Sequence, residues 1–523
     1  MSEKPKRQRF AGILLHPTSL PGRGGIGDIG APAHHFIHFL AEAAQTLWQV
    51  CPLGPTGFGD SPYAALSAFA GNPLLLSLES LVKDGFLDQS ERDSYPGFAA
   101  DQVNYEGVVP AKSATLKKAG ERFHERAGGE TRKEFEAFCK RRASWLDDFA
   151  LFMAVRKAHN GDAWPTWEPP LARREPAALK QARKDHAEAI EGHKALQFLF
   201  FRQWAETKKL ANDNHIRIIG DAPIFVAHDS ADVWARPDLF FLGADGQPSV
   251  VSGVPPDYFS PQGQRWGNPI YRWREKKKEV YQWWVERLRV NLEMVDIIRL
   301  DHFRGFDAYW ESPANEPTTL NGRWVKGPGA DFFRYLRDQI GSLPLIAEDL
   351  GVITPRVDAL RKEFGLPGMK ILQFAFGDDA ANPYLPHNIE SDCVVYTGTH
   401  DNDTTRGWYQ KAGEAVQDRV RRYLWCEGAN IHLDLIRSAL MSTARIAIIP
   451  LQDVLGLGGE ARMNVPGVAE GNWKWRVTGD QLNSAKAGML RYLTELYGRG
   501  EPPVKPAGEK KEPRLDPDLA AEK

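Results

Sequence analysis

Past its midpoint the chain reads Val295-Asp296-Ile297-Ile298-Arg299-Leu300-Asp301-His302-Phe303. A short apolar run that ends in charged residues is typical of a buried β-strand at the point where it leaves its sheet. Arg299 and Asp301 are two residues apart, so such a strand presents both on one face. The stretch therefore predicts a buried strand with a charged carboxyl end.

Seven other runs repeat this pattern, and helical stretches separate them. The eight predicted strands are Phe10–Leu15, Leu47–Pro52, Ile216–Ile219, Val295–Leu300, Leu345–Ala347, Met369–Phe374, Cys393–Tyr396 and Arg445–Leu451. Eight such units predict an α/β fold, a (β/α)8 TIM barrel with helical and loop-rich insertions. A doubly wound sheet is the alternative, but it usually has fewer strands.

Uneven spacing of these runs predicts how the chain is organised. We expect a flexible N-terminal tail, a first part of the barrel, a helical insertion, the rest of the barrel and a disordered C-terminal tail. The corresponding ranges are 1–9, 10–81, 82–192, 193–498 and 499–523, with active-site loop insertions near 224–273 and 306–330. Long loops on a barrel usually form its site.

Composition excludes some classes of partner. Lys and Arg total 66 against 68 Asp and Glu, which leaves a net charge of -2 and predicts binding to neither nucleic acid nor membrane. The four cysteines, Cys51, Cys139, Cys393 and Cys426, form no CxxC pair. Together with the polar, basic first nine residues, they predict a cytoplasmic protein without a zinc site. The oligomeric state is left open.

A glycine-rich stretch, Gly25–Gly30, matches the dinucleotide fingerprint GxGxxG. However, the second strand ends in Val50-Cys51-Pro52 and lacks the acid that would hold a ribose. We therefore interpret the stretch as a loop that needs unusual backbone angles, and we expect no cofactor.

Three acids follow predicted strands. Asp301 lies beside Arg299, and an ionised aspartate held there could act as a nucleophile, although such pairs are often structural. Glu348 could serve as a general acid if burial raised its pKa, whereas the adjacent Asp349 is expected to cap a helix. Asp401 follows His400, which suggests hydrogen bonding to a sugar more than a metal site.

Taken together, these residues resemble those of one family, the amylomaltases or disproportionating enzymes of glycoside hydrolase family 77. The matching segments are Gly12–His16, Thr18–Pro21, Ser61–Ala64, Gly220–Pro223, Gly253–Phe259, Arg265–Pro269, Arg299–Gly305, Ala347–Gly351, Thr399–Asn402 and Asn464–Gly467. They cover almost the whole chain except its ends.

The resemblance implies a 4-α-glucanotransferase of carbohydrate metabolism that uses a retaining double displacement. It implies that Asp301 is the nucleophile, Glu348 the general acid/base and Asp401 the transition-state stabiliser. The implied substrate-binding residues are Ser61, Tyr63, Asp221, Asp257, Phe259, Trp266, Arg299, His400 and Asn464. Donors and acceptors would be maltooligosaccharides and α-1,4-glucans, with glucose as a further acceptor. A retaining α-glucan hydrolase is the alternative, because the same acids would serve it.

Overall fold

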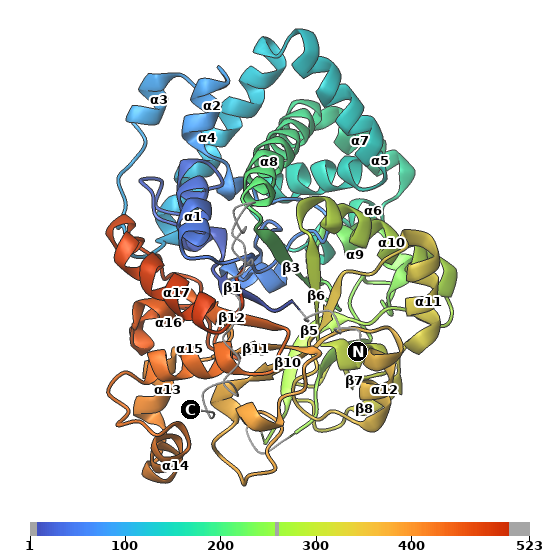
Figure 1. The fold of residues 1–523 in the computed structure, drawn as a ribbon. Helices are drawn as coiled ribbons and strands as arrows, with labels where there is room; N and C mark the ends of the chain where they lie inside the picture. The colour runs from blue at the N-terminus through green and yellow to red at the C-terminus, as the bar shows by residue number, and fades with distance from the viewer. Residues whose placement is uncertain (1–7, 257–260, 501–523) are drawn as a thin grey trace, which may run out of the picture.

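Eight parallel strands form the centre of the protein in the computed structural model, which describes residues 8–256 and 261–500 (Figure 1). They are β1 (Phe10–Leu14), β2 (Leu47–Gln49), β3 (Arg217–Pro223), β6 (Ile297–Asp301), β9 (Leu345–Ala347), β10 (Gly368–Ile371), β11 (Cys393–Tyr396) and β12 (Ile446–Pro450). Their order is β10-β11-β12-β1-β2-β3-β6-β9. Each predicted run overlaps one of these strands, although β3, β6 and β10 extend beyond the predicted bounds, and the (β/α)8 barrel is confirmed.

The barrel closes between β9 and β10. The Ala347 amide donates to the Pro367 carbonyl at 2.9 Å, and the Met369 amide donates to Asp349 Oδ1 at 2.6 Å. Asp349 Oδ2 lies 3.2 Å from Arg361 Nε. The prediction that Asp349 caps a helix is wrong, because its carboxylate bridges the last gap of the sheet.

The barrel interior is filled by side chains that alternate along the strands. They are Leu14, Leu47, Ile219, Ile346, Met369, Ile371, Val394, Tyr396, Ile446 and Ile448, with Ile297 packed against them. Residues two positions further along a strand face the same way. Asp221, Arg299 and Glu348 follow Ile219, Ile297 and Ile346 in this manner, so the pleat directs them to the mouth of the barrel.

A second, antiparallel sheet is built from the segments that follow β3 and β6. It has the order β5-β4-β7-β8, with β4 (Val250–Val254), β5 (Gln264–Pro269), β7 (Ala308–Pro313) and β8 (Arg323–Lys326). Strand β4 pairs with both β5 and β7. The two loop insertions expected near 224–273 and 306–330 thus meet in one sheet.

Helices surround the barrel, and those that follow β2 lie together at one side (Figure 1). The helices are α1 (Ala31–Glu42), α2 (Leu78–Lys83), α3 (Gln89–Asp93), α4 (Tyr105–Arg126), α5 (Gly129–Ala158), α6 (Pro169–Ala172), α7 (Pro176–Asp185), α8 (Ala187–Asp213), α9 (Ala231–Ala235), α10 (Lys277–Met294), α11 (Gly329–Ile340), α12 (Pro355–Glu363), α13 (Thr405–Lys411), α14 (Glu414–Leu424), α15 (Ile431–Met441), α16 (Leu451–Leu455) and α17 (Ser484–Leu496). None of them combines the length and the apolar character that a bilayer crossing needs, within the residues that the structure describes.

Helix α8 joins the helical region to the barrel. It packs against α4 and α5 and then leads directly into β3. The ring of its Trp204 lies beside the ring of Trp48 in β2, with the ring centroids 6.1 Å apart. The predicted boundary at residue 192 therefore falls within a continuous helix. The assignment of 82–192 as a separate insertion stays a prediction, and most of the two predicted tails lies outside the described residues.

The Gly25–Gly30 stretch is shaped by close backbone packing. Gly25 has a φ of 72°, which favours glycine. A Cβ on Gly27 would lie 1.9 Å from the Pro17 carbonyl oxygen, so a larger residue could not fit. The glycines are explained by the course of the chain at the start of α1.

Candidate active site

Asp301, the last residue of β6, is held by Arg299 from the same strand. Arg299 Nη2 donates to Asp301 Oδ1 at 2.8 Å, and Arg299 Nε donates to Asp221 Oδ2 at 2.7 Å. The Tyr63 hydroxyl also donates to Asp221 Oδ2, at 2.8 Å. The four side chains form one hydrogen-bonded set, which fixes the rotamer of Asp301.

Strand register explains this arrangement. Residues of β3 and β6 pair in parallel, with Asp221 opposite Arg299 and Pro223 opposite Asp301. Neighbouring strands hold paired residues on the same face about 4.8 Å apart. The predicted third strand, Ile216–Ile219, ends before Asp221, whereas β3 continues through Asp221 to Pro223.

Glu348 follows β9, and backbone amides orient its carboxyl group. The His302 amide donates to Oε2 at 2.7 Å and the Leu350 amide donates to Oε1 at 2.9 Å. His302 comes directly after Asp301 and has a φ of 52°, the left-handed region that non-glycine residues seldom adopt. This conformation turns the His302 amide toward Glu348, so the residue next to Asp301 is hydrogen-bonded to the Glu348 carboxyl group.

The pKa values of the two acids lie on opposite sides of neutrality. Burial and the adjacent Asp301 carboxylate raise the pKa of Glu348 to about 8. Burial also raises the pKa of Asp301, to about 6, although Arg299 opposes that rise. The charge of Arg299 thus acts on Asp301 in the direction expected from the sequence, but burial and nearby carboxylates outweigh it. Near pH 7 Asp301 is ionised and Glu348 is protonated.

Asp401 lies in the loop after β11 and faces open space, with 47% of its side chain exposed. Asn464 Nδ2 donates to its Oδ1 at 2.6 Å, and His400 Nε2 lies 3.4 Å from its Oδ2. The surrounding protein displaces part of the solvent near Asp401, which tends to raise its pKa, but His400 and the hydrogen bond from Asn464 outweigh this desolvation and lower the pKa. Asp401 therefore stays ionised.

An aromatic wall connects Asp401 to the Asp221 set. The Tyr63 ring stacks on His400 with centroids 4.8 Å apart, and Trp473 packs against both rings. Burial and the Asp221 carboxylate raise the pKa of Tyr63 well above its usual value, so its hydroxyl keeps its proton. Ser61 caps the short turn Pro62–Ala64, where its hydroxyl accepts from the Tyr63 amide at 3.2 Å.

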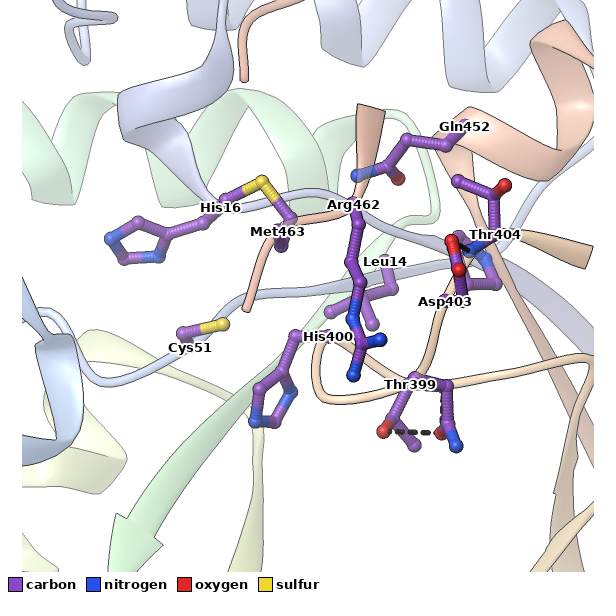
Figure 2. A pocket seen from close by; sticks show the side chains of 12 residues that line it. Leu14, His16, Cys51, Thr399, His400, Asp403, Thr404, Gln452, Arg462 and Met463 are labelled. Carbon is purple, nitrogen blue, oxygen red and sulfur yellow. Dashed lines mark hydrogen bonds between the residues drawn. The ribbon is translucent and has the colours of Figure 1, made fainter. Parts of the chain in front are cut away.

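A small pocket closes the other side of His400. Figure 2 shows His16, Cys51, His400 and Arg462 among the side chains that line it. Its volume is about 20 Å³, which holds about one water molecule and no sugar ring. The reactive side of this region is therefore the side where Asp401 is exposed.

Trp266 of β5 extends the site toward the antiparallel sheet. The residue is 40% exposed, and its ring lies perpendicular to that of His302 with the ring centroids 4.7 Å apart. A flat, partly exposed ring beside the acids can stack on a sugar. Asp257 and Phe259, two further predicted contacts, lie outside the described residues.

Two residues that sequence analysis did not name complete the site. Arg462 Nη2 donates to the Asp401 carbonyl at 2.7 Å and Trp473 forms part of the aromatic wall. Arg462 is two residues before Asn464 and so lies just ahead of the matching segment Asn464–Gly467. Trp473 carried no local signal beyond an aromatic-rich stretch.

The fold and the two acids Asp301 and Glu348 together define a class of enzyme. A barrel with an ionised aspartate beside a protonated glutamate at its mouth is typical of enzymes that cleave or transfer glycosidic bonds with retention.

Comparison with known proteins agrees with this class. The sequence profile of glycoside hydrolase family 77, described as 4-alpha-glucanotransferase, matches residues 15–482. The 4-alpha-glucanotransferase of Synechocystis sp. is 52% identical over 94% of this chain and 98% of that protein. That of Thermus thermophilus is 50% identical over 94% and 99%.

A solved structure is similar as well. Amylomaltase from Streptococcus agalactiae in complex with acarbose superposes with a TM-score of 0.91 at 37% identity, over 94% of this chain and all of that one. The chain belongs to glycoside hydrolase family 77, the 4-alpha-glucanotransferases, and the resemblance stated from the sequence is confirmed.

Proposed function

We propose that this protein transfers segments of an α-1,4-glucan to a second glucan or to glucose by a retaining double displacement. The observation that carries the proposal is the pair formed by Asp301, ionised beside Arg299, and Glu348, whose raised pKa keeps its proton at neutral pH. Retaining enzymes need one carboxylate in each of these states.

In the first step Glu348 gives its proton to the glycosidic oxygen while the bond from that oxygen to the anomeric carbon breaks. Asp301 attacks the anomeric carbon from the opposite side and forms a β-linked ester. Arg299 occupies Oδ1 of Asp301, which leaves Oδ2 for this attack. The leaving glucan departs with a free 4-hydroxyl group.

In the second step Glu348, now a carboxylate, takes the proton of an acceptor 4-hydroxyl as that oxygen attacks the anomeric carbon. The ester bond to Asp301 breaks, and an α-1,4 linkage forms again. The two backbone amides stay on Glu348 in both states, because a carboxyl group can accept both bonds and still donate its own proton.

Asp401 supports both steps without forming a bond to the sugar. Its ionised carboxylate opposes the positive charge that develops on the sugar ring in the transition state. His400 and Asn464 keep it ionised and oriented, and we expect Tyr63 and His400 to contact the ring of the donor sugar.

Transfer requires that a sugar hydroxyl reach the ester before water does. Trp266 offers an exposed ring at the acceptor side, and the stretch that contains Asp257 and Phe259 follows β4 directly. Membership of the 4-alpha-glucanotransferases supports transfer over the hydrolase alternative. We further propose a cytoplasmic role in maltooligosaccharide or storage-glucan metabolism, in keeping with four free cysteines.

Incubation with maltotriose tests the proposal. The expected products are glucose and a ladder of longer maltooligosaccharides, and the total number of reducing ends should stay constant because every broken linkage is made again. A steady rise in reducing ends, with glucose and maltose as the only products, would contradict transfer.

A further inference from the structure

Only one of the two carboxylate oxygens of Asp221 is hydrogen-bonded to the neighbouring site residues Arg299 and Tyr63. Its side chain is 1% exposed, and its Oδ2 receives hydrogen bonds from both Arg299 and Tyr63. Its Oδ1 is buried and has no hydrogen-bond partner within the described part of the chain. A buried carboxylate oxygen without a donor has lost its hydration without compensation, so this oxygen needs a partner.

A buried arginine in α10 has the complementary property. Arg287 is 3% exposed and stacks over Trp284 at 4.6 Å. Its Nε and Nη1 groups are buried and likewise lack an acceptor among residues 8–256 and 261–500. The ionisable groups that act on it are Tyr271, Asp232 and Asp221.

Both side chains line the same cavity. The cavity lies below the Tyr63 turn, between the end of β3 and α10, and its volume is about 40 Å³. A water molecule needs about 10–15 Å³ of such space and two or more polar partners, so the cavity has room for roughly two or three. The N–H groups of Arg287 and the Oδ1 of Asp221, unpaired within the described residues, are the donors and the acceptor that such water requires.

We propose that Arg287 is a positioning residue for the transfer reaction. It holds Asp221 Oδ1 through water in the shared cavity, so that the other oxygen of Asp221 stays turned toward Arg299. This inference rests on the proposed function, because it acts through the set that holds the nucleophile.

Charge supports the same role. Asp221, Arg299 and Asp301 together carry two negative charges and one positive charge, and Arg287 supplies the missing positive charge from below. Asp221 raises the pKa of Asp301 by its negative charge. Arg287 interacts with Asp221 through its opposite charge. In this proposal it therefore offsets part of the effect of Asp221 and helps to keep the nucleophile ionised at neutral pH.

Substitution of Arg287 by Met and by Lys tests the proposal. R287M keeps an apolar stem against Trp284 but removes the charge and the donors. We expect its kcat on maltotriose to fall about 10–100-fold with KM changed by less than about threefold, because the bound substrate meets a misplaced nucleophile. The acid limb of its pH profile should move up by about half a unit or more. R287K should keep the acid limb of the parent.

Arg142 provides a matched control. It is also a buried arginine over an aromatic ring, 5.2 Å from the centroid of Phe201, and it pairs with Glu293 away from the barrel mouth. R142M should lower the thermal stability while leaving kcat per folded molecule and the pH profile unchanged. An equal loss of kcat in R142M and R287M would mean that Arg287 is merely structural.

A double-mutant cycle with D221N separates this inference from the proposed function. If Arg287 acts through Asp221, R287M should cost little further activity in the D221N background. Full additivity, or wild-type kcat and pH profile in folded R287M, would overturn the inference while leaving the proposed function intact. Full activity of D221N alone would also overturn the inference, because Arg287 is proposed to act through Asp221; the proposed function would fail only if the unsubstituted enzyme made no maltooligosaccharides longer than maltotriose from maltotriose. If R287M does not fold, an R287K protein with a displaced acid limb would also overturn the inference.

Discussion

Replacing Glu348 by Gln removes the proposed general acid and keeps the size of the side chain. With a pKa raised to about 8 by burial and by Asp301, Glu348 is mainly protonated at pH 7, so the substitution changes the charge of the site little. What is lost is a transferable proton. General acid catalysis contributes about 10²–10⁴-fold to the rate, which corresponds to a lowering of the activation free energy by about 3–5.5 kcal/mol. The expected loss of kcat/KM on maltotriose lies in that range.

A substrate whose leaving group needs no proton tests whether Glu348 is the general acid. Fluoride leaves without protonation, so the first turnover of α-maltosyl fluoride by E348Q should fall less than about tenfold. The ester on Asp301 should then accumulate, because its breakdown needs Glu348 as a base, and intact-protein mass spectrometry would detect it. Stopped-flow release of fluoride measures the first step.

A matched control is Glu293→Gln, in which the glutamate lies near the end of α10 and pairs with Arg142. It should behave as wild type on both substrates. Equal losses of E348Q on maltotriose and maltosyl fluoride would refute the assignment of Glu348 as the acid, since they would indicate a general disturbance of the site.

Three further outcomes are expected. The kcat/KM of the wild type should follow a bell-shaped pH profile with limbs near 6 and 8, since Asp301 must be ionised and Glu348 protonated, and a flat profile from pH 5 to 9 would contradict this. The pKa of Glu348 rises from 4.5 unfolded to about 8 folded, so its contribution to the free energy of unfolding is full below pH 4.5 and is lost as the pH rises through 8. Urea denaturation should show that E348Q lacks this decline, worth about 1–3 kcal/mol after screening; parallel slopes would count against it. Asp401→Asn should lower kcat about 10³-fold with little change in KM, because a charge that opposes the transition-state sugar is lost, whereas a change confined to KM would point to simple binding.

Strand positions were accessible from the sequence because buried parallel strands are short, apolar and bounded by polar residues. Ile297 and Ile346 fill the barrel, and the pleat then fixes Arg299 and Glu348 at its mouth. The local sequence was therefore sufficient to predict the barrel and the order of the acids along its strands. Family resemblance supplied their separate roles.

Other features depend on contacts between distant segments. In the antiparallel sheet β4 pairs with β7, which is about fifty residues further along the chain. The local pattern of apolar and polar residues does not predict which distant strands pair. Asp349 bridges β9 to β10 instead of capping a helix, since the acceptor was needed at the closure of the sheet. The raised pKa of Asp301 was also missed, because burial is set by the whole fold.

The central claim is that Asp301 becomes covalently attached to the sugar. Incubation with a 5-fluoro-α-glucosyl fluoride should form the ester quickly, because its leaving group departs readily, and hydrolyse it slowly, because the ring fluorine disfavours the positive charge of the next transition state. Proteolysis and tandem mass spectrometry would then locate the label. We expect a label on Asp301 that disappears in D301N. A label on Asp221 or Asp401, or a product with inverted anomeric configuration and no label, would contradict it.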